Sequence, residues 1–311
     1  MSFADAIIII LGLALFETIS SIDNAVVNAD VLSSMSKRAR RWFLFYGIIV
    51  AVFVIRGLLP LIIVYASNPA LGLMGALTAT FSSDPSVREA IEHQAPVLLA
   101  GGGIYLIYLF LHWLFIEQKE YAFFIESFIH SKLSFWFFAA ASAFLLAFAA
   151  ISAQVDSRLI FGALVGSTAF FITNGFKKNA EEAEKSLKSQ RISDISKILY
   201  LEVLDATFSI DGVLGAFAFT MSVPLILLGN GLGAYVVRWF TVHGVETVKK
   251  YRYLKNGAMY SIGLLGIVMV GESLSVDLPK WLPTLITFAV VGLFLWLSKR
   301  ALREEGALKE Y

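Results

Sequence analysis

The 311-residue sequence contains no cysteine, which excludes disulfide bonds, thiolate metal sites and cysteine nucleophiles. It lacks the Gly-x-x-x-x-Gly-Lys-Ser/Thr segment of a P-loop, so ATP hydrolysis by that motif is excluded as well. No lysine or arginine precedes Ile7, where a signal peptide would carry positive charge, so we expect the apolar stretch that follows to be retained. A net charge of +1 gives no indication of a nucleic-acid partner. The abundant apolar residues are therefore the main guide to the protein's class.

Long apolar stretches are what the sequence has in excess. Hydrophobic residues make up 58% of the chain and the mean hydropathy is +0.74, whereas soluble domains are about 45–50% apolar. A membrane-spanning helix needs about 20 mostly apolar residues, and lipid forces such a segment to satisfy its own backbone. The sequence thus predicts an all-α, multi-pass protein of the plasma membrane. The nine predicted spans are 3–32, 42–66, 96–116, 134–152, 158–176, 198–221, 223–241, 257–275 and 281–298.

The distribution of lysine and arginine among the connections predicts the orientation of these spans. If the N-terminus lies outside, the inner segments hold 20 of the 25 basic residues. The outer segments then hold three, which are Arg88, Arg158 and Lys280. The other two, Arg56 and Arg238, lie inside predicted spans. We therefore expect an outside N-terminus and a cytoplasmic C-terminus.

A pattern of acid-x-x-x-Ser-Ile-Asp occurs twice, as Glu17-Thr-Ile-Ser-Ser21-Ile22-Asp23 in the first span and Asp205-Ala-Thr-Phe-Ser209-Ile210-Asp211 in the sixth. Equivalent spans lie five apart, an odd number, so they cross the membrane in opposite directions. The sequence therefore predicts two inverted three-helix repeats, spans 1–3 and 6–8, as in many secondary transporters. The following spans contribute three further matched pairs, which are Arg56 with Arg238, Tyr105 with Tyr260 and Glu117 with Glu272.

The repeats divide the chain into four predicted segments. The first and third are the repeats themselves, and the second and fourth carry the spans that are not repeated. The segments are 1–116 for the first repeat, 117–197 for two linking spans and a charged cytoplasmic loop, 198–275 for the inverted second repeat, and 276–311 for the last span and a cytoplasmic tail.

Ionisable and polar side chains in the two motifs are candidates for function, because charges at membrane depth are costly. At about 100° per residue, most of them form one polar stripe on each helix. Asp23 and Asp211 each lie roughly 120° away from their stripe. A helix that unwinds at Ser-Ile-Asp would turn these aspartates inward, so we expect both motifs to be helix breaks that meet near the midplane. The stripes hold Glu17, Ser20, Ser21, Asn24 and Asn28 in the first span, and Glu202, Asp205, Ser209 and Gly212 in the sixth.

These motifs offer carboxylates, amides and hydroxyls, and the four histidines lie outside them. Oxygen ligands of this kind suit Mg²⁺, Ca²⁺ or Mn²⁺. Without an ion the carboxylates would repel each other and bind protons, which gives a basis for exchanging protons with metal. The hydroxyls and amides have an alternative role as contacts between helices, and the arginines as structural ion-pair partners. The predicted ligands are Glu17, Asp23, Asn24, Glu202, Asp205 and Asp211, and the supporting or gating residues are Ser21, Ser209, Asn28, Arg56 and Arg238.

The two motifs also resemble a known family. The stretch Ser21-Ile-Asp23-Asn24-Ala-Val-Val27, preceded by Glu17, is similar to the first signature of the TerC membrane family, and 202–211 is similar to the second. That family belongs to the lysine-exporter superfamily and was named for tellurium resistance. The resemblance implies manganese efflux, with Glu17, Asp23, Asn24, Asp205 and Asp211 as ligands. Typical members read Asp-Ser-Ile-Pro-Ala where this chain reads Asp211-Gly-Val-Leu-Gly215, which indicates a divergent subfamily.

The sequence thus predicts a secondary transporter, not an enzyme, that exports a hard divalent cation such as Mn²⁺ and carries no covalent cofactor. Export of a dication against 100 mV costs roughly 4.6 kcal/mol, which makes proton antiport the natural energy source. The expected partners are the bilayer, the metal ion and protons. Two alternatives are an exporter of another small solute and a non-transporting scaffold in stress or tellurium resistance. An intramembrane aspartyl protease is disfavoured, because Phe208-Ser209-Ile210 precedes Asp211 where such proteases carry Gly-x-Gly.

Overall fold

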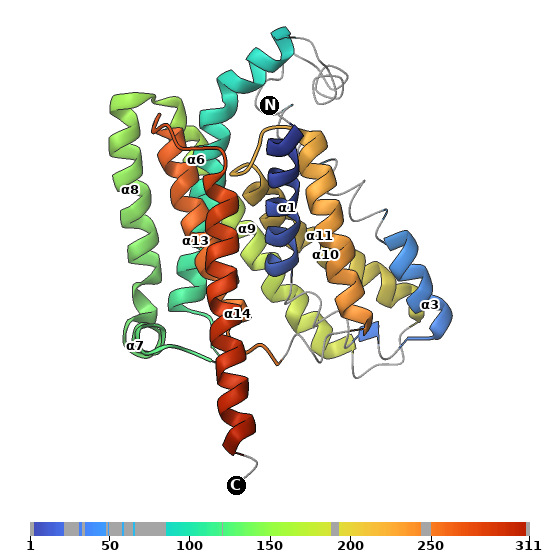
Figure 1. Cartoon of the computed structure of the whole chain (residues 1–311). Coiled ribbons are helices and arrows are strands. Elements are labelled where there is room, and N and C mark those ends of the chain that lie inside the picture. Colours follow the sequence, from blue (N-terminus) through green and yellow to red (C-terminus); the bar gives the residue numbers. More distant parts are fainter. Residues whose placement is uncertain are drawn as a thin grey trace. The chain divides into compact units, whose positions relative to one another are not determined.

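The computed structural model of the chain describes residues 3–21, 31–32, 35–47, 49, 58, 65, 85–119, 121–187, 193–243 and 250–308 (Figure 1). All regular structure in these ranges is helical, without a strand. The elements are α1 (Phe3–Ser20), α3 (Lys37–Trp42), the π-helical turn η1 (Phe43–Gly47), α6 (Pro85–Phe115), α7 (Phe124–Leu133), the 3₁₀ turn η4 (Ser134–Trp136), α8 (Phe137–Val155), α9 (Arg158–Leu187), α10 (Asp194–Ala216), α11 (Val223–His243), α13 (Leu254–Ser273) and α14 (Leu282–Leu308).

Seven of the described helices are long and apolar enough to cross a membrane. They correspond to seven of the nine predicted spans. Of the other two, residues 42–66 fall mostly outside the described part of the chain. Residues 198–221 fall on α10, whose three acids at 202, 205 and 211 make it less apolar than the seven. The seven apolar windows are Phe3–Ser20, His93–Phe115, Ser134–Val155, Arg158–Phe176, Val223–Thr241, Leu254–Ser273 and Leu282–Glu304.

Helix α10 is unbroken from Asp194 to Ala216, so the predicted helix break at the second motif is wrong. The helix begins after Ser193, whose hydroxyl accepts a hydrogen bond from the Ser196 backbone amide at 3.2 Å. It then continues through Asp211 and Gly212. Gly212 does not unwind the helix; it makes room for a neighbouring side chain, as described below. At the first motif α1 ends at Ser20, and residues 22–30 lie outside the described chain.

The chain divides into two compact units. The first comprises Met1–Gln94 and Phe171–Val245, and the second comprises Ala95–Phe170 and Glu246–Tyr311. The first unit thus holds α1, α3, α10 and α11, and the second holds α8, α13, α14 and most of the apolar window of α6. Each unit therefore contains segments of both predicted repeats. The repeats themselves, the four segments along the chain and the membrane orientation stay predictions.

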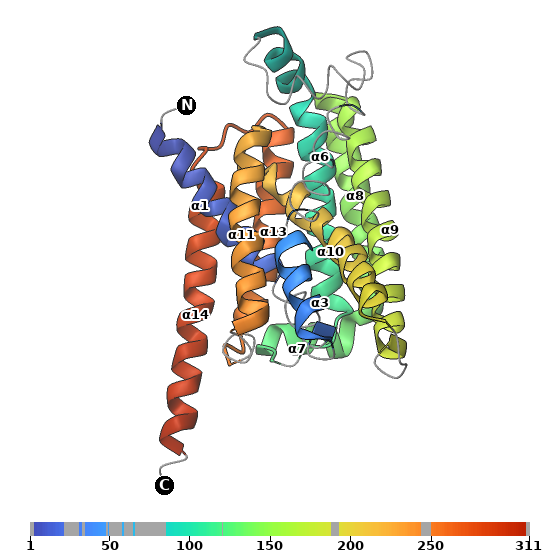
Figure 2. The same cartoon turned by 90° about the vertical axis from the view of Figure 1, so that its right-hand side faces the viewer.

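In the first unit α1 packs closely along α11 (Figures 1 and 2). Glycines four residues apart on α11 allow this approach. A Cβ added at Gly229 would overlap the side chain of Leu13, and one added at Gly233 would overlap that of Glu17. Small residues at this spacing let membrane helices approach each other closely. The contact fixes the last turn of α1, which carries Glu17, against α11.

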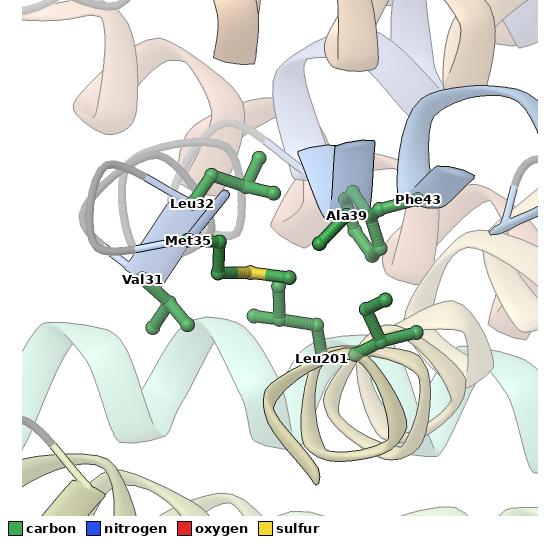
Figure 3. Close-up of a cluster of buried hydrophobic side chains, with 7 residues drawn as sticks. Val31, Leu32, Met35, Ala39, Phe43 and Leu201 are labelled. Atoms are coloured by element: carbon green, nitrogen blue, oxygen red, sulfur yellow. The ribbon is translucent and has the colours of Figure 1, made fainter. Parts of the chain in front are cut away.

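A cluster of buried apolar side chains joins the segment around α3 to the N-terminal half of α10 (Figure 3). Phe43, at the start of η1, is fully buried there, as is Leu201 of α10. Burial of this apolar surface stabilises the contact. The cluster places the first turn after α3 beside Glu202, the residue that follows Leu201. Its members are Val31, Leu32, Met35, Ala39, Phe43, Ile198 and Leu201.

Aromatic contacts dominate the second unit. The rings of Tyr260 on α13 and Phe294 on α14 stack with centroids 5.5 Å apart. Tyr260 also meets Phe110 and Trp113 of α6 edgewise or tilted, at 5.6 Å in both cases. Offset and tilted aromatic pairs of this kind are favourable beyond the area they bury. They hold α6, α13 and α14 together in this unit.

Candidate metal site

Glu17 lies in the last turn of α1 and its side chain is fully buried. The hydroxyl of Ser21, one turn further on, donates a hydrogen bond to Glu17 Oε1 at 2.8 Å. A carboxylate away from water needs such donors or a cation, because burial of an isolated charge is costly. Glu17 and Ser21 were both predicted for the site from the first motif, and the structure places them in direct contact.

The carboxylate of Glu17 lies against Gly212 of α10. A Cβ built on Gly212 would collide with Glu17 Oε2, so only a glycine fits at this position without a shift of its neighbour. Asp211 directly precedes Gly212, and only 8% of its surface is exposed. The acid of the first motif thus meets the turn of α10 that carries the acid of the second. This contact, in the first unit, places one predicted ligand, Glu17, against the residue that follows another, Asp211.

Helix α11 adds a polar residue that the sequence analysis missed. Asn230 is fully buried, and its side-chain amide donates to the Gly212 carbonyl oxygen at 3.4 Å. One turn along the same helix, Gly233 lies against Cβ and Cγ of Glu17. The available signal was a lone amide inside an apolar span, in the segment Leu228-Gly-Asn230-Gly-Leu-Gly233. The repeat comparison gave no reason to notice it, because Asn230 stands outside both motifs.

A second polar cluster in this unit joins Glu202 to Arg238. Arg238 Nη2 lies 3.7 Å from Glu202 Oε1, and the two side chains are only 5% and 12% exposed. Arg238 Nη1 also donates to the Phe43 carbonyl oxygen at 2.7 Å. A Cβ on Gly47 would collide with both charged groups, so the π-helical turn η1 packs its glycine onto the pair. π-Helical turns are rare and occur frequently at functional sites.

The remaining predicted site residues have no described side chains. Asp205 and Ser209 lie on α10, but only their backbone is described. Within the described ranges no three or more His, Asp or Glu side chains are close enough together to hold a metal ion. The metal-ligand role of Glu17 and Asp211 therefore stays a prediction. Asp23, Asn24, Asn28 and Arg56 lie outside the described residues.

Two acids of the second unit, Glu117 and Glu126, have structural partners. Glu117, one of the matched repeat pairs, forms an ion pair with Lys255 at the start of α13. Nearby, the ammonium group of Lys119 donates to the carbonyl oxygens of Trp113 and Leu114 at 2.8 and 3.0 Å, which completes the end of α6. Burial lowers the pKa of Lys119 from its ordinary value. These contacts connect α6 to its surroundings and do not form a site.

Glu126 of α7 is fully buried in the same unit. Its Oε2 accepts hydrogen bonds from the Phe123 backbone amide at 3.1 Å and from Asn256 Nδ2 at 2.7 Å. The first bond is the returning half of a capping box, which satisfies an amide at the start of α7. The second joins α7 to the first turn of α13. Glu126 therefore connects α7 to α13 by a buried hydrogen bond.

Comparisons with known proteins agree with this membrane architecture. The chain matches the family described as "Protein of unknown function (DUF475)" over residues 22–305. It is 27% identical over 114 residues to the "Uncharacterized membrane protein YceF" of Bacillus subtilis (strain 168), which is 35% of this chain and 44% of that protein. It is 26% identical over 102 residues to a "UPF0053 protein" of Haemophilus influenzae, which is 33% of this chain and 43% of that protein. Each match thus spans less than half of the relative. No solved structure matches the chain.

The name of the Bacillus subtilis relative describes a membrane protein and gives no function. Together with seven apolar helices, it supports a multi-pass membrane protein. Neither relative's name includes the TerC family, a metal ion or transport. The TerC resemblance and the manganese specificity drawn from it therefore stay predictions.

Proposed function

Since the chain belongs to the DUF475 family, and a buried acid of its first motif lies against the helix turn that carries an acid of the second, we propose that it is a secondary transporter that exports a hard divalent cation. The cation we propose is Mn²⁺, exchanged for protons across the plasma membrane. One observation carries the proposal: the buried carboxylate of Glu17 lies against Gly212, beside the buried Asp211. Acids at this depth are costly unless they serve a pathway or a pair.

The chemistry of the donors supports a hard cation. Glu17 and Asp211 supply two carboxylates, Ser21 a hydroxyl and Asn230 an amide. Such oxygen ligands match the preference of Mg²⁺, Ca²⁺ and Mn²⁺, and the carboxylates supply the negative charge that a dication requires. The resemblance of both motifs to the TerC signatures is what favours Mn²⁺ among these ions. In the proposed site Asp23, Asn24 and Asp205 complete the ligand set.

Proton exchange follows from the same carboxylates. When the dication leaves, the buried carboxylates of the proposed site lack a counter-charge, and in this proposal protons replace it. The pair of Arg238 with Glu202 would serve as a separate, permanently neutralised element on α10 and α11. In this proposal the inverted repeats and the outside N-terminus give the exchange its two alternating openings.

The test is Mn²⁺ flux into proteoliposomes of the purified protein, with and without a pH gradient. We expect a proton gradient to drive Mn²⁺ movement by the wild type, and Asp211→Asn to abolish it. The control is Asp277→Asn, which removes an exposed acid between α13 and α14 and should leave flux unchanged. If the wild type moves no divalent cation under any gradient, the proposal is wrong. The buried acids would then serve another solute or a non-transporting scaffold.

A further inference from the structure

Asn230 carries a buried side-chain oxygen close to the turn of α10 against which Glu17 lies. The residue is fully buried in α11, and its Nδ2 donates to the Gly212 carbonyl oxygen at 3.4 Å. This bond fixes the orientation of the amide, since the Gly212 carbonyl can only accept and so must face the nitrogen. The side-chain oxygen of Asn230 must therefore point to a different partner.

Within the described part of the chain no donor reaches Asn230 Oδ1. A buried amide oxygen without a donor or a cation costs free energy, and native proteins satisfy nearly all such groups. The residue is not needed to fill space alone, because an apolar side chain on α11 would pack there without that cost. Asn230 Oδ1 therefore needs a partner that accepts its electron pair, which is either a hydrogen-bond donor or a cation.

The surroundings of Asn230 indicate which acceptor it meets. The carbonyl oxygen of Gly212 accepts the hydrogen bond from Asn230, and the Glu17 carboxylate lies against the Cα of the same glycine. Gly233, one turn further along α11, contacts Cβ and Cγ of that same glutamate. Asp211 is the residue next to Gly212. The turn of α10 at Gly212 thus contacts both the Glu17 carboxylate and the Asn230 amide. Carboxylate and amide oxygens are the ligands that hard divalent cations prefer.

We propose that Asn230 Oδ1 is a neutral ligand of the transported cation, which rests on the proposed function and adds a third helix to its site. The amide oxygen completes the coordination without adding charge. The carboxylates of the proposed site then balance the charge of the ion, and the amide supplies a further oxygen ligand of the kind that hard cations bind.

The experiment is Mn²⁺ binding to the purified, full-length protein in detergent, measured by the loss of the free-ion EPR signal. Asn230→Ala should weaken Mn²⁺ affinity by roughly ten- to hundredfold. Substitution of residues around a metal typically lowers the metal affinity by about this factor. Asn256→Ala is the matched control, because it removes another buried asparagine, from the second unit. It should lower thermal stability and leave Mn²⁺ affinity unchanged.

A second variant covers the case in which Asn230→Ala does not fold. Asn230→Asp keeps the shape and supplies a carboxylate oxygen at the same place. It should bind Mn²⁺ at pH 8 and lose affinity more steeply than the wild type toward pH 6, as the added acid takes up a proton. If Asn230→Ala binds as tightly as the wild type, or Asn230→Asp keeps the wild-type pH profile, the ligand role is overturned while the proposed function stands. If the wild type itself binds no divalent cation, both are overturned.

Discussion

The guanidinium group of Arg238 lies over the ring of Phe43, 4.3 Å from the ring centroid, and donates to the carbonyl oxygen of the same residue at 2.7 Å. One side chain of α11 thus holds both the ring and the backbone of the first residue of η1. Arginine suits this position, since its planar fork stacks on an aromatic face while its N–H groups reach other acceptors. The same fork reaches Glu202 of α10, so three segments of the first unit converge on it.

Arg238→Gln is expected to destabilise the first unit strongly. The change leaves the Glu202 carboxylate and the Phe43 carbonyl oxygen in a buried place without their cation. Removal of one partner from a buried ion pair typically costs about 3–5 kcal/mol. Thermal unfolding of the detergent-solubilised protein would measure the loss. The double variant Arg238→Gln, Glu202→Gln should recover part of it, because the uncompensated charge is then gone.

Arg300→Gln is the matched control for this prediction. Arg300 pairs with Glu304 one turn away on α14, with both side chains more than 60% exposed. Exposed pairs of this type contribute less than about 0.5 kcal/mol. Equal losses for the two arginine variants would show that the buried position of Arg238 has no special role, and a double variant no better than Arg238→Gln would contradict the ion pair with Glu202.

Gly212→Ala tests the contact between the two motifs. The added methyl group would collide with Glu17 Oε2, so either the carboxylate or α10 must shift. Overpacking of this kind typically costs about 1–3 kcal/mol. We expect lower thermal stability together with loss of Mn²⁺ binding.

In α9, Gly175→Ala is the control, because a Cβ there meets nothing within 4 Å. It should be neutral or stabilising by up to about 1 kcal/mol, since alanine favours the helix. If both variants behave alike, Glu17 does not need the space that Gly212 provides.

The sequence predicted the helical membrane fold because apolar length is a local property that lipid enforces. It also singled out Glu17 and Asp211, since the repeated motif placed buried acids on two different helices, and the structure places Glu17 against Gly212, the residue after Asp211. It failed at Asp211, where Ser, Asp and Gly suggested a break, because a glycine that relieves a side-chain contact looks the same in sequence as one that loosens a helix. Asn230 was missed for a related reason. Its place in the site depends on a contact with the carbonyl oxygen of Gly212, which lies 18 positions earlier in the sequence.

Asn256→Ala should destabilise the second unit by roughly 1–3 kcal/mol, because the buried carboxylate of Glu126 loses a donor at 2.7 Å. The loss should appear in thermal unfolding. Glu126→Gln should cost less, since it keeps the volume and removes the charge that the amide serves. Gln118→Ala is the control, an exposed amide in the connection between α6 and α7 whose loss should change stability by no more than about 0.5 kcal/mol. An effect of Asn256→Ala no larger than that of Gln118→Ala would show that the hydrogen bond between Asn256 and Glu126 does not stabilise the second unit.

Asp194 should make the attachment of α3 to α10 dependent on pH. Its Oδ2 accepts a hydrogen bond from the Ser36 backbone amide at 3.3 Å. Hydrogen bonding by Ser36, by its side chain first and by this backbone amide second, holds the pKa of Asp194 below its usual range. A depressed pKa in the folded state means that the carboxylate stabilises the fold above its ordinary pKa of about 3.9, and that this contribution disappears as the pH falls through the folded value.

Wild type should therefore unfold at a higher temperature than Asp194→Asn at pH 7. The difference should shrink steadily below pH about 4, because the protonated aspartic acid then resembles the amide. Melting curves of both proteins between pH 7 and pH 3.5 would measure it. A difference that is constant with pH, or that grows in acid, would show that the ionised form of Asp194 does not hold Ser36.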